Sequence, residues 1–305
     1  MRTALLRASQ SQWLRQQVRG RGFVRRAVSR FMPGEDVESA LQAAQTFVQH
    51  KMTTVLTQLG ENVADANEAR AVTRHYTDVL NRIQALKLPA HISVKPTQLG
   101  LDLSAGLCLE QLTALVAHAA AVGTFVSIDM EGSPYVDRTL DLYRKLRPQH
   151  PNVGVCLQAY LHRTPDDLNS LSPLLPTIRL VKGAYNEPAN VAIPRKRDVD
   201  QRYLELAQRL LATTPRPPQP HGFGTHDMAL IHRICEHARA SGVPNSAFDL
   251  QMLFGIRPAD QVRLAQAGYA MRVLISYGSY WFPWYMRRLA ERPANVWFVV
   301  KSMFA

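Results

Sequence analysis

The chain has 305 residues, 46% hydrophobic and 8% aromatic, which is enough apolar material for one large domain or two ordinary ones. This composition excludes a mainly disordered chain, and no apolar run reaches the roughly 18 residues that a membrane-spanning helix needs. The formal charge is +12, and eight positive charges are arginines within residues 1–32, which contain no acidic residue. Removing those eight charges leaves +4 for the remaining chain, so the composition does not indicate a general nucleic-acid binder.

Residues 1–48 are predicted to form a basic helical arm. Its arginines are interspersed with apolar residues, which indicates an amphipathic helix interrupted at Gly20 and Gly22. Three interpretations stay open: an arm that packs on the body, a surface that attaches to anionic lipid, and a cleaved organelle-targeting peptide. The last part of the arm, Val37–Val48, is expected to be a regular helix.

Beyond the arm, short β-rich runs alternate with longer helical patterns. The expected strands are Thr53–Leu59, His91–Lys95, Thr124–Met130, Val153–Leu157, Thr177–Lys182, Gly222–Thr225, Ala247–Leu253 and Arg272–Ser276. The expected helices are Glu68–Leu86, Leu109–Ala121, Val136–Leu146, Asp198–Leu211, Met228–Ala240 and Pro258–Ala267. Because strand and helix repeat, and because the strands are too apolar to have a face in water, they indicate a parallel sheet covered by helices.

Eight such units favour an α/β fold of the TIM type, a (βα)₈ barrel, over residues 49–305. The length beyond the arm fits the typical barrel of about 250 residues. A Rossmann fold is the alternative, but no G-x-G-x-x-G follows the first strand and opens a helix.

Several common chemical motifs are missing from the sequence. Cys108, Cys156 and Cys235 lack the spacing of a metal or redox pair, so we expect buried thiols in a reducing compartment. HExxH, paired CxxC, Walker A and Gly-x-Ser-x-Gly sequences are also missing. We therefore predict no metal site, P-loop or nucleophile elbow.

Ionisable and amide side chains follow nearly every expected strand, at the end where barrel enzymes place catalytic groups. They are Glu61, Lys95, Asp129, Glu131, Gln158, Arg163, Arg179, Lys182, Thr225, His226, Asp227, Gln251, Arg287 and Arg288. Each alone has an ordinary structural explanation, such as a solvated lysine or a hydrogen-bonded core histidine. Their common position indicates a rim with cations in excess, which suits a carboxylate or a phosphate-bearing cofactor.

Five segments resemble motifs of the proline dehydrogenase family and occur in the family order. They are Gln158–Arg163, Arg179–Tyr185, Gly224–Asp227, Phe248–Arg257 and Met286–Asn295. The chain most resembles the short monofunctional bacterial branch rather than the long bifunctional proteins. The resemblance implies a distorted barrel that holds FAD at the strand C-termini. It also implies oxidation of L-proline to Δ1-pyrroline-5-carboxylate, with electrons passing to a membrane quinone.

The resemblance also implies roles for single residues. Asp129 would be an active-site acid near substrate and flavin, and Arg179 would lie by flavin N5. Lys95, Arg287 and Arg288 would hold the substrate carboxylate. The implied FAD contacts are Met130, Gln158, Lys182, Gly183, Ala184, Thr225 and His226. Glu61 matches the family acid that pairs with the first of the two arginines as a gate over the pocket.

Two pocket positions depart from the family, which usually has tyrosine where this chain has Leu274 and Trp284. The first tyrosine covers the proline ring, whereas Leu274 lacks an aromatic face and a hydroxyl, and Trp284 adds bulk. A changed ring contact of this size is worth about 1–3 kcal/mol in discrimination. Hydroxyproline or another cyclic imino acid therefore stays open as the substrate.

A non-catalytic barrel that binds an anionic small molecule is the third hypothesis. The joint presence of Lys95, Asp129, Arg179, Arg287 and Arg288 argues against it. For the enzyme, the expected partners are a quinone and a pyrroline-5-carboxylate dehydrogenase that receives the labile product, and no nucleic acid. We expect a cytoplasmic protein, with the arm as a peripheral contact to the inner face of the plasma membrane.

Overall fold

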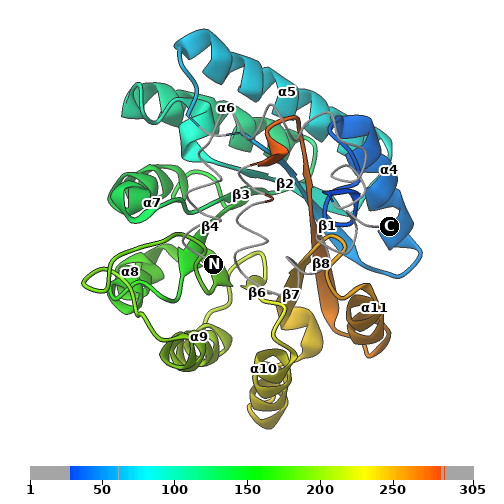
Figure 1. Ribbon diagram of the computed structural model, residues 1–305, viewed down its shortest axis with the longest axis vertical. Helices are drawn as coiled ribbons and strands as arrows, with labels where there is room; N and C mark the ends of the chain where they lie inside the picture. Colours follow the sequence, from blue (N-terminus) through cyan, green and yellow to red (C-terminus); the bar gives the residue numbers. More distant parts are fainter. Residues whose placement is uncertain (1–27, 61, 283–284, 286–305) are drawn as a thin grey trace, which may run out of the picture.

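Eight parallel strands close into a barrel in the computed structural model, which describes residues 28–60, 62–282 and 285 (Figure 1). The strands are β1 Thr53–Gln58, β2 Ala90–Val94, β3 Val126–Ile128, β4 Val153–Gln158, β5 Thr177–Val181, β6 His221–Gly224, β7 Phe248–Leu253 and β8 Ala270–Tyr277. They are ordered β1 to β8 around the barrel, and β8 pairs with β1. The predicted (βα)₈ barrel is confirmed.

Helices surround the barrel, as Figure 1 shows. They are α4 Val37–Val48, α5 Ala66–Ala85, α6 Ala105–Ala121, α7 Val136–Leu146, α8 Thr164–Leu171, α9 Lys196–Leu211, α10 Met228–Ala240 and α11 Pro258–Gln266. Short 3₁₀ turns lie at η1 Pro96–Leu99, η2 Ser133–Tyr135, η3 Ser172–Leu174 and η4 Asn245–Ala247. The sequence did not predict α8, because its eight residues carry only two buried leucines and give a weak helical period.

Side-chain caps fix where several helices begin. Asp36 accepts a hydrogen bond from Ser39 N at 2.7 Å at the start of α4, and Asp65 caps α5 through Asn67 N at 2.7 Å. Ser104 caps α6 in the same way. These caps satisfy backbone N–H groups that have no partner within the helix, so they define the ends of the loops that carry the rim residues.

Side chains alternate between the two faces of each strand. Outward residues such as Ile92 and Leu180 are fully buried between the barrel and the helices, where the apolar core lies. Inward residues are often polar, for example Asp249 and Gln251 on β7 and Arg272 on β8. The strands were expected to be too apolar to have a face in water, and these polar side chains lie inside the barrel. A barrel interior is closed by side chains from opposite strands, so polar groups there can bond to one another.

Val28, Phe31 and Met32, within the predicted arm, are buried. Residues 1–27, the rest of the arm ahead of this segment, lie outside the described residues. The three cysteines are buried and unpaired, which confirms that part of the prediction. Among the described helices, none combines the length and apolar character that crossing a membrane requires.

Candidate active site

Asp129 is the centre of a polar cluster at the C-terminal ends of β2 and β3. Its Oδ1 accepts hydrogen bonds from Ser93 Oγ and from Arg179 Nη1, both at 2.6 Å. Lys95 Nζ lies 3.5 Å from Oδ2, and Arg179 Nη1 also donates to Ser93 Oγ at 3.0 Å. The structure thus brings together three predicted site residues, Lys95, Asp129 and Arg179, although they come from three different strands or strand ends.

Charge in this cluster is unequal, since two cations face one carboxylate. The side chains are only 11%, 19% and 7% exposed for Lys95, Asp129 and Arg179, so water screens them weakly. Burial by itself would raise the pKa of Asp129, but Lys95, Arg179 and the Ser93 hydroxyl outweigh it and hold this pKa below its ordinary value. Asp129 is therefore ionised at neutral pH, and the cluster keeps a positive surplus suited to an anion.

Arg179 has donors to spare. Its side chain leaves the middle of β5 and points into the barrel, and Nη1 donates to both Ser93 and Asp129. Nε and Nη2 are buried and have no hydrogen-bond partner among the described residues. A buried guanidinium with unused N–H groups is costly unless a ligand accepts from it. This is the donor arrangement that a flavin ring with acceptor atoms would fit.

The turn after β3 is fixed from both neighbouring strands. Glu131 accepts from Thr97 N at 3.0 Å and from Thr97 Oγ1 at 2.6 Å, and its own carbonyl accepts from Gln158 Nε2 at 2.9 Å. Glu131 is therefore committed to holding the turn, although the sequence placed it beside Asp129 on the rim. Gln158 and Met130, both predicted cofactor contacts, are buried in the same turn region.

Gly183 allows the chain after β5 to press against the end of β4. It has a φ of +118°, and a β-carbon there would lie 2.1 Å from Tyr160 Cδ1. Tyr160 N donates to Lys182 O at 2.9 Å, which fixes the same approach. Only glycine fits this close approach to Tyr160, and Gly183 and the following Ala184 are half-buried just after β5.

Lys182 is paired with carboxylates. Its ammonium contacts Asp200 and lies 3.0 Å from Asp227 Oδ2, and Lys196 contacts the same two carboxylates. Two lysines and two aspartates make this group neutral overall. Burial opposes ionisation of Asp227, but hydrogen bonding to Lys182 and the lysine charges outweigh it and lower the Asp227 pKa. A phosphate bound here would share Lys182 with these aspartates.

Thr225 and His226 join the end of β6 to β7. Thr225 N donates to Gln251 O at 3.1 Å, and His226 Nε2 accepts from Leu253 N at 2.9 Å. Because a backbone N–H can only donate, Nε2 of His226 carries no proton, and the neutral ring is protonated on Nδ1. The two residues lie at the predicted rim beside Leu253.

Leu274 lies two residues after Arg272 on β8 and shares its inward face. It pairs in register with Val55 of β1 and Leu253 of β7, and it is half-buried. Leu274 is nearer than Arg272 to the C-terminal end of β8, so it lies between Arg272 and the rim.

The remaining predicted residues lie outside the described part of the chain. They are the gate residue Glu61 and the substrate contacts Trp284, Arg287 and Arg288. Arg163, another rim candidate, is turned to ion pairs with Asp137 and Asp167 on the helical layer.

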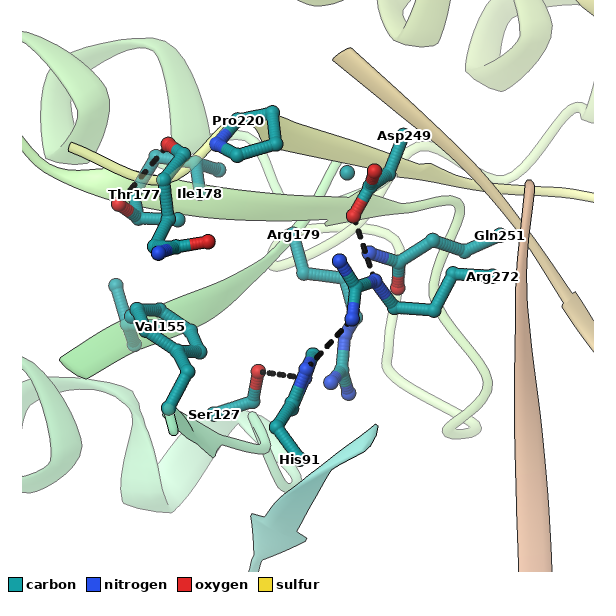
Figure 2. A pocket seen from close by; sticks show the side chains of 14 residues that line it. His91, Ser127, Val155, Thr177, Ile178, Arg179, Pro220, Asp249, Gln251 and Arg272 are labelled. Carbon is teal, nitrogen blue, oxygen red and sulfur yellow. Dashed lines mark hydrogen bonds and ion pairs between the residues drawn. The ribbon is translucent and has the colours of Figure 1, made fainter. Parts of the chain in front are cut away.

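A second polar cluster, the barrel floor, lies nearer the N-terminal ends of the strands and was missed by sequence reasoning. Figure 2 shows Arg272 between Asp249 and His91, with Nε 2.6 Å from Asp249 Oδ2 and Nη1 2.8 Å from His91 Nδ1. His91 Nε2 lies 3.1 Å from Ser127 Oγ. The cluster lines a cavity of about 20 Å³ that also touches Arg179. The overlooked signal was alternation, as in Asp249-Leu250-Gln251.

Protonation in the floor follows from its donors. Arg272 can only donate, so His91 Nδ1 accepts and the ring is neutral with its proton on Nε2. Burial first, and then the charges of Arg272 and Arg179, lower the His91 pKa well below its ordinary value. Burial raises the pKa of Asp249, and Arg272 opposes this only in part.

Comparison with known proteins places this geometry in a family. The family model described as proline dehydrogenase matches residues 40–301. Proline dehydrogenase 1 of Bacillus subtilis subsp. natto is 37% identical over 274 residues, covering 90% of this chain and 89% of the relative. Proline dehydrogenase of Deinococcus radiodurans is 36% identical over 279 residues, with the same coverage of each chain.

A solved structure agrees on the fold. Proline utilization A (PutA) from Bdellovibrio bacteriovorus, inactivated by N-propargylglycine, superposes with a TM-score of 0.81 at 24% identity over 88% of this chain. This chain spans 33% of that PutA chain. The match over most of its length, together with the two bacterial relatives, shows that this chain belongs to the proline dehydrogenase family of oxidoreductases.

Proposed function

We propose that this protein catalyses the FAD-dependent oxidation of L-proline to Δ1-pyrroline-5-carboxylate and passes the electrons to a quinone. The observation that carries the proposal is the buried cluster of Lys95, Asp129 and Arg179 at the barrel rim, in a chain of this family. Its positive surplus suits an anionic amino acid, and Nε and Nη2 of Arg179 have no hydrogen-bond partner among the described residues.

Substrate binding is assigned to the cations. Lys95, with Arg287 and Arg288 from the sequence, would hold the carboxylate, because guanidinium groups bind carboxylates in a bidentate, oriented way. Asp129 keeps Lys95 and Arg179 at fixed positions around the pocket. Holding the ring in one orientation presents the carbon next to the nitrogen for reaction and supplies much of the rate enhancement.

The residues present fit FAD on one observation, the buried Nε and Nη2 of Arg179, which have no acceptor among the described residues. Gly183 is a further proposed contact. FAD, when bound, supplies the acceptor for the hydride that leaves the carbon beside the ring nitrogen. Arg179 would stabilise negative charge that develops near it. The further contacts that we propose are Met130, Gln158, Lys182, Ala184, Thr225 and His226.

Proton handling follows from the ionisation of Asp129. The substrate amine must be neutral before hydride leaves, and the remaining N–H proton is released to solvent as the C=N bond forms. Asp129 is ionised because the Lys95 and Arg179 charges, with Ser93, overcome burial and lower its pKa. It orients the cations rather than donating a proton, so activity should rise with pH until the neutral amine dominates.

The wider setting is proposed on the sequence alone. Glu61 would pair with Arg287 as a gate, and the basic arm would lie on anionic membrane at the inner face to reach the quinone. A pyrroline-5-carboxylate dehydrogenase would consume the product in the cytoplasm.

Anaerobic addition of L-proline and then trans-4-hydroxy-L-proline to the purified protein, followed by the flavin absorbance, tests the proposal. Bleaching by L-proline is expected. Bleaching only by hydroxyproline would favour the second candidate, which Leu274 supports because it leaves room above the ring. A protein purified without flavin would instead favour a non-catalytic barrel.

A further inference from the structure

A carboxylate outside the cluster described above joins two rim loops. Glu187, in the loop between β5 and α9, accepts a hydrogen bond from Ser133 N at 2.7 Å through Oε1. Its Oε2 accepts from Ser133 Oγ at 2.6 Å. Both carboxylate oxygens are thus used on one residue of the turn between β3 and α7. Glu187 and Ser133 are 54 residues apart in sequence, so this contact is purely tertiary.

Both ends of the β5–α9 loop are fixed to the end of β4. Tyr160 N donates to Lys182 O at 2.9 Å at one end, and Ile193 N donates to Tyr160 O at 2.8 Å at the other. Leu161 and Ala192 form an isolated bridge beside this second bond. The middle of the loop, with Glu187, instead reaches across to the turn after β3.

Gly132 lies beside this contact. A β-carbon on Gly132 would lie 3.6 Å from Glu187 Oε1 and 4.0 Å from Tyr185 Cδ1. Tyr185 therefore lies against the same turn as Glu187, two residues along the loop. Because Gly183 and Ala184 directly precede Tyr185, the Glu187–Ser133 contact fixes the stretch that we propose lies on the cofactor.

The turn that receives Glu187 is the one that carries Asp129. Asp129 N is bonded to Val94 O at 2.9 Å, Glu131 is held by Thr97 and Gln158, and Ser133 is held by Glu187. Asp129, Glu131 and Ser133 are therefore hydrogen-bonded to β2, to β4 and to the β5–α9 loop, respectively. Loss of the last tie would free one side of the turn and the middle of the loop together.

We propose that Glu187 is a positioning residue for the dehydrogenation: by holding Ser133, it closes the β5–α9 loop on the β3–α7 turn and fixes Asp129 relative to Gly183–Tyr185. This inference rests on the proposed function. The role is geometric, since the carboxylate faces two donors of one serine and needs no ionic partner there. Small displacements of groups in an oriented site cost large factors in rate.

The test compares Glu187→Ala with Glu187→Gln. Glutamine can accept from Ser133 N through its carbonyl and donate to Ser133 Oγ through its amide, so it preserves the contact without the charge. We expect Glu187→Ala to lower kcat about tenfold per bound flavin with a small change in KM. Glu187→Gln should stay within about twofold of wild type. Glu205→Ala, which removes a half-exposed glutamate paired with Arg202 on α9, is the matched control.

Limited chymotrypsin digestion gives a readout that does not depend on activity. Tyr185 is half-buried between the two fixed ends of the loop, so the chain should be cut after Tyr185 faster in Glu187→Ala than in wild type or Glu187→Gln. A double-mutant cycle with Ser133→Ala should be non-additive, because Ser133→Ala removes one of the two hydrogen bonds that Glu187→Ala removes.

Two results would overturn the inference. One is a Glu187→Ala protein with wild-type kcat and wild-type digestion, and the other is a Glu187→Gln protein as impaired as Glu187→Ala. Failure of the proposed function is separate: a wild-type protein that no cyclic imino acid reduces would remove the catalytic role, while digestion would still report whether Glu187 holds the loop.

Discussion

The barrel carries two buried polar clusters, one at the rim and one in the floor, and each contains an arginine, an aspartate and a serine. In the floor, Arg272, Asp249, His91 and Ser127 bond to one another in an unbroken series. At the rim, one nitrogen of Arg179 donates to protein partners, and its other two nitrogens have no hydrogen-bond partner among the described residues. A closed network stabilises the fold, whereas an open one awaits a ligand. We propose on this difference that Arg272 stabilises the fold and that Arg179 binds a ligand, although both arginines are largely buried.

The largest expected effect comes from breaking the floor. Arg272→Met leaves Asp249 buried without its cation, and the free energy of unfolding should fall by about 3–5 kcal/mol. Urea unfolding at neutral pH measures it. Arg263→Met is the control, because that arginine pairs with Asp260 on an exposed face and should cost about 0–1 kcal/mol. Equal losses in both variants would show that the floor ion pair does not stabilise the barrel.

Breaking the rim should affect catalysis instead. Arg179→Met removes the donors proposed for the flavin, and kcat should fall about 100-fold, since lost stabilisation of developing charge costs about 10²–10³. Asp129 keeps Ser93 and Lys95 as partners, so the fold should survive. Steady-state kinetics normalised to bound flavin measure this, and an unchanged kcat would remove Arg179 from the chemistry.

Acid should weaken the N-terminal side of the barrel. Burial lowers the pKa of His221 from 6.5 to about 4, and Ile178 N donates to its Nδ1 at 3.2 Å. The folded state binds this proton only at a lower pH than the unfolded state does. The free energy of unfolding therefore falls as pH drops from about 6.5 towards 4. The loss for this one residue is about 3 kcal/mol.

His221→Asn, whose carbonyl can still accept from Ile178 N, should flatten that pH dependence, whereas the exposed His232→Asn should leave it unchanged. Unfolding free energies measured at several pH values decide the matter. A wild-type protein that is equally stable at pH 4.5 and pH 7 would contradict the assignment of neutral histidines to this end of the barrel.

The smallest expected effect concerns the ring contact. Leu274→Tyr restores the aromatic face that the family usually has, and should shift the ratio of kcat/KM for proline over hydroxyproline about tenfold towards proline, consistent with about 1–3 kcal/mol for one pocket contact. Flavin content should not change. An unaltered ratio would mean that Leu274 does not line the ring pocket.

Much of this architecture could be predicted from the sequence, because strand and helix alternate with turns between them. The expected helices Val136–Leu146 and Met228–Ala240 end where the structure ends them. Strand ends were less well predicted: Thr124–Met130 contracts to Val126–Ile128, since the chain turns at Asp129 to enter the rim. Lys95, Asp129 and Arg179 were expected at the same end of the barrel, and their side chains meet there although Arg179 leaves the middle of β5.

The sequence could not predict contacts between residues that are far apart in the chain. Ser93, the common partner of Asp129 and Arg179, looks like an ordinary strand serine. Glu187 and Ser133 lie in separate loops without a local pattern that relates them. The floor was not predicted, although Asp249 and Gln251 alternate with apolar residues in β7. The placement of Glu61, Trp284, Arg287 and Arg288 stays a prediction.

The central claim is that the open rim cluster performs the chemistry while the closed floor only holds the barrel. Anaerobic stopped-flow reduction of bound flavin by L-proline, measured side by side in wild type, Arg179→Met and Arg272→Lys, tests it most directly. We predict near-equal rates for wild type and Arg272→Lys and a rate about 100-fold lower for Arg179→Met. A floor variant as slow as the rim variant, or a wild-type flavin that L-proline does not reduce, would contradict it.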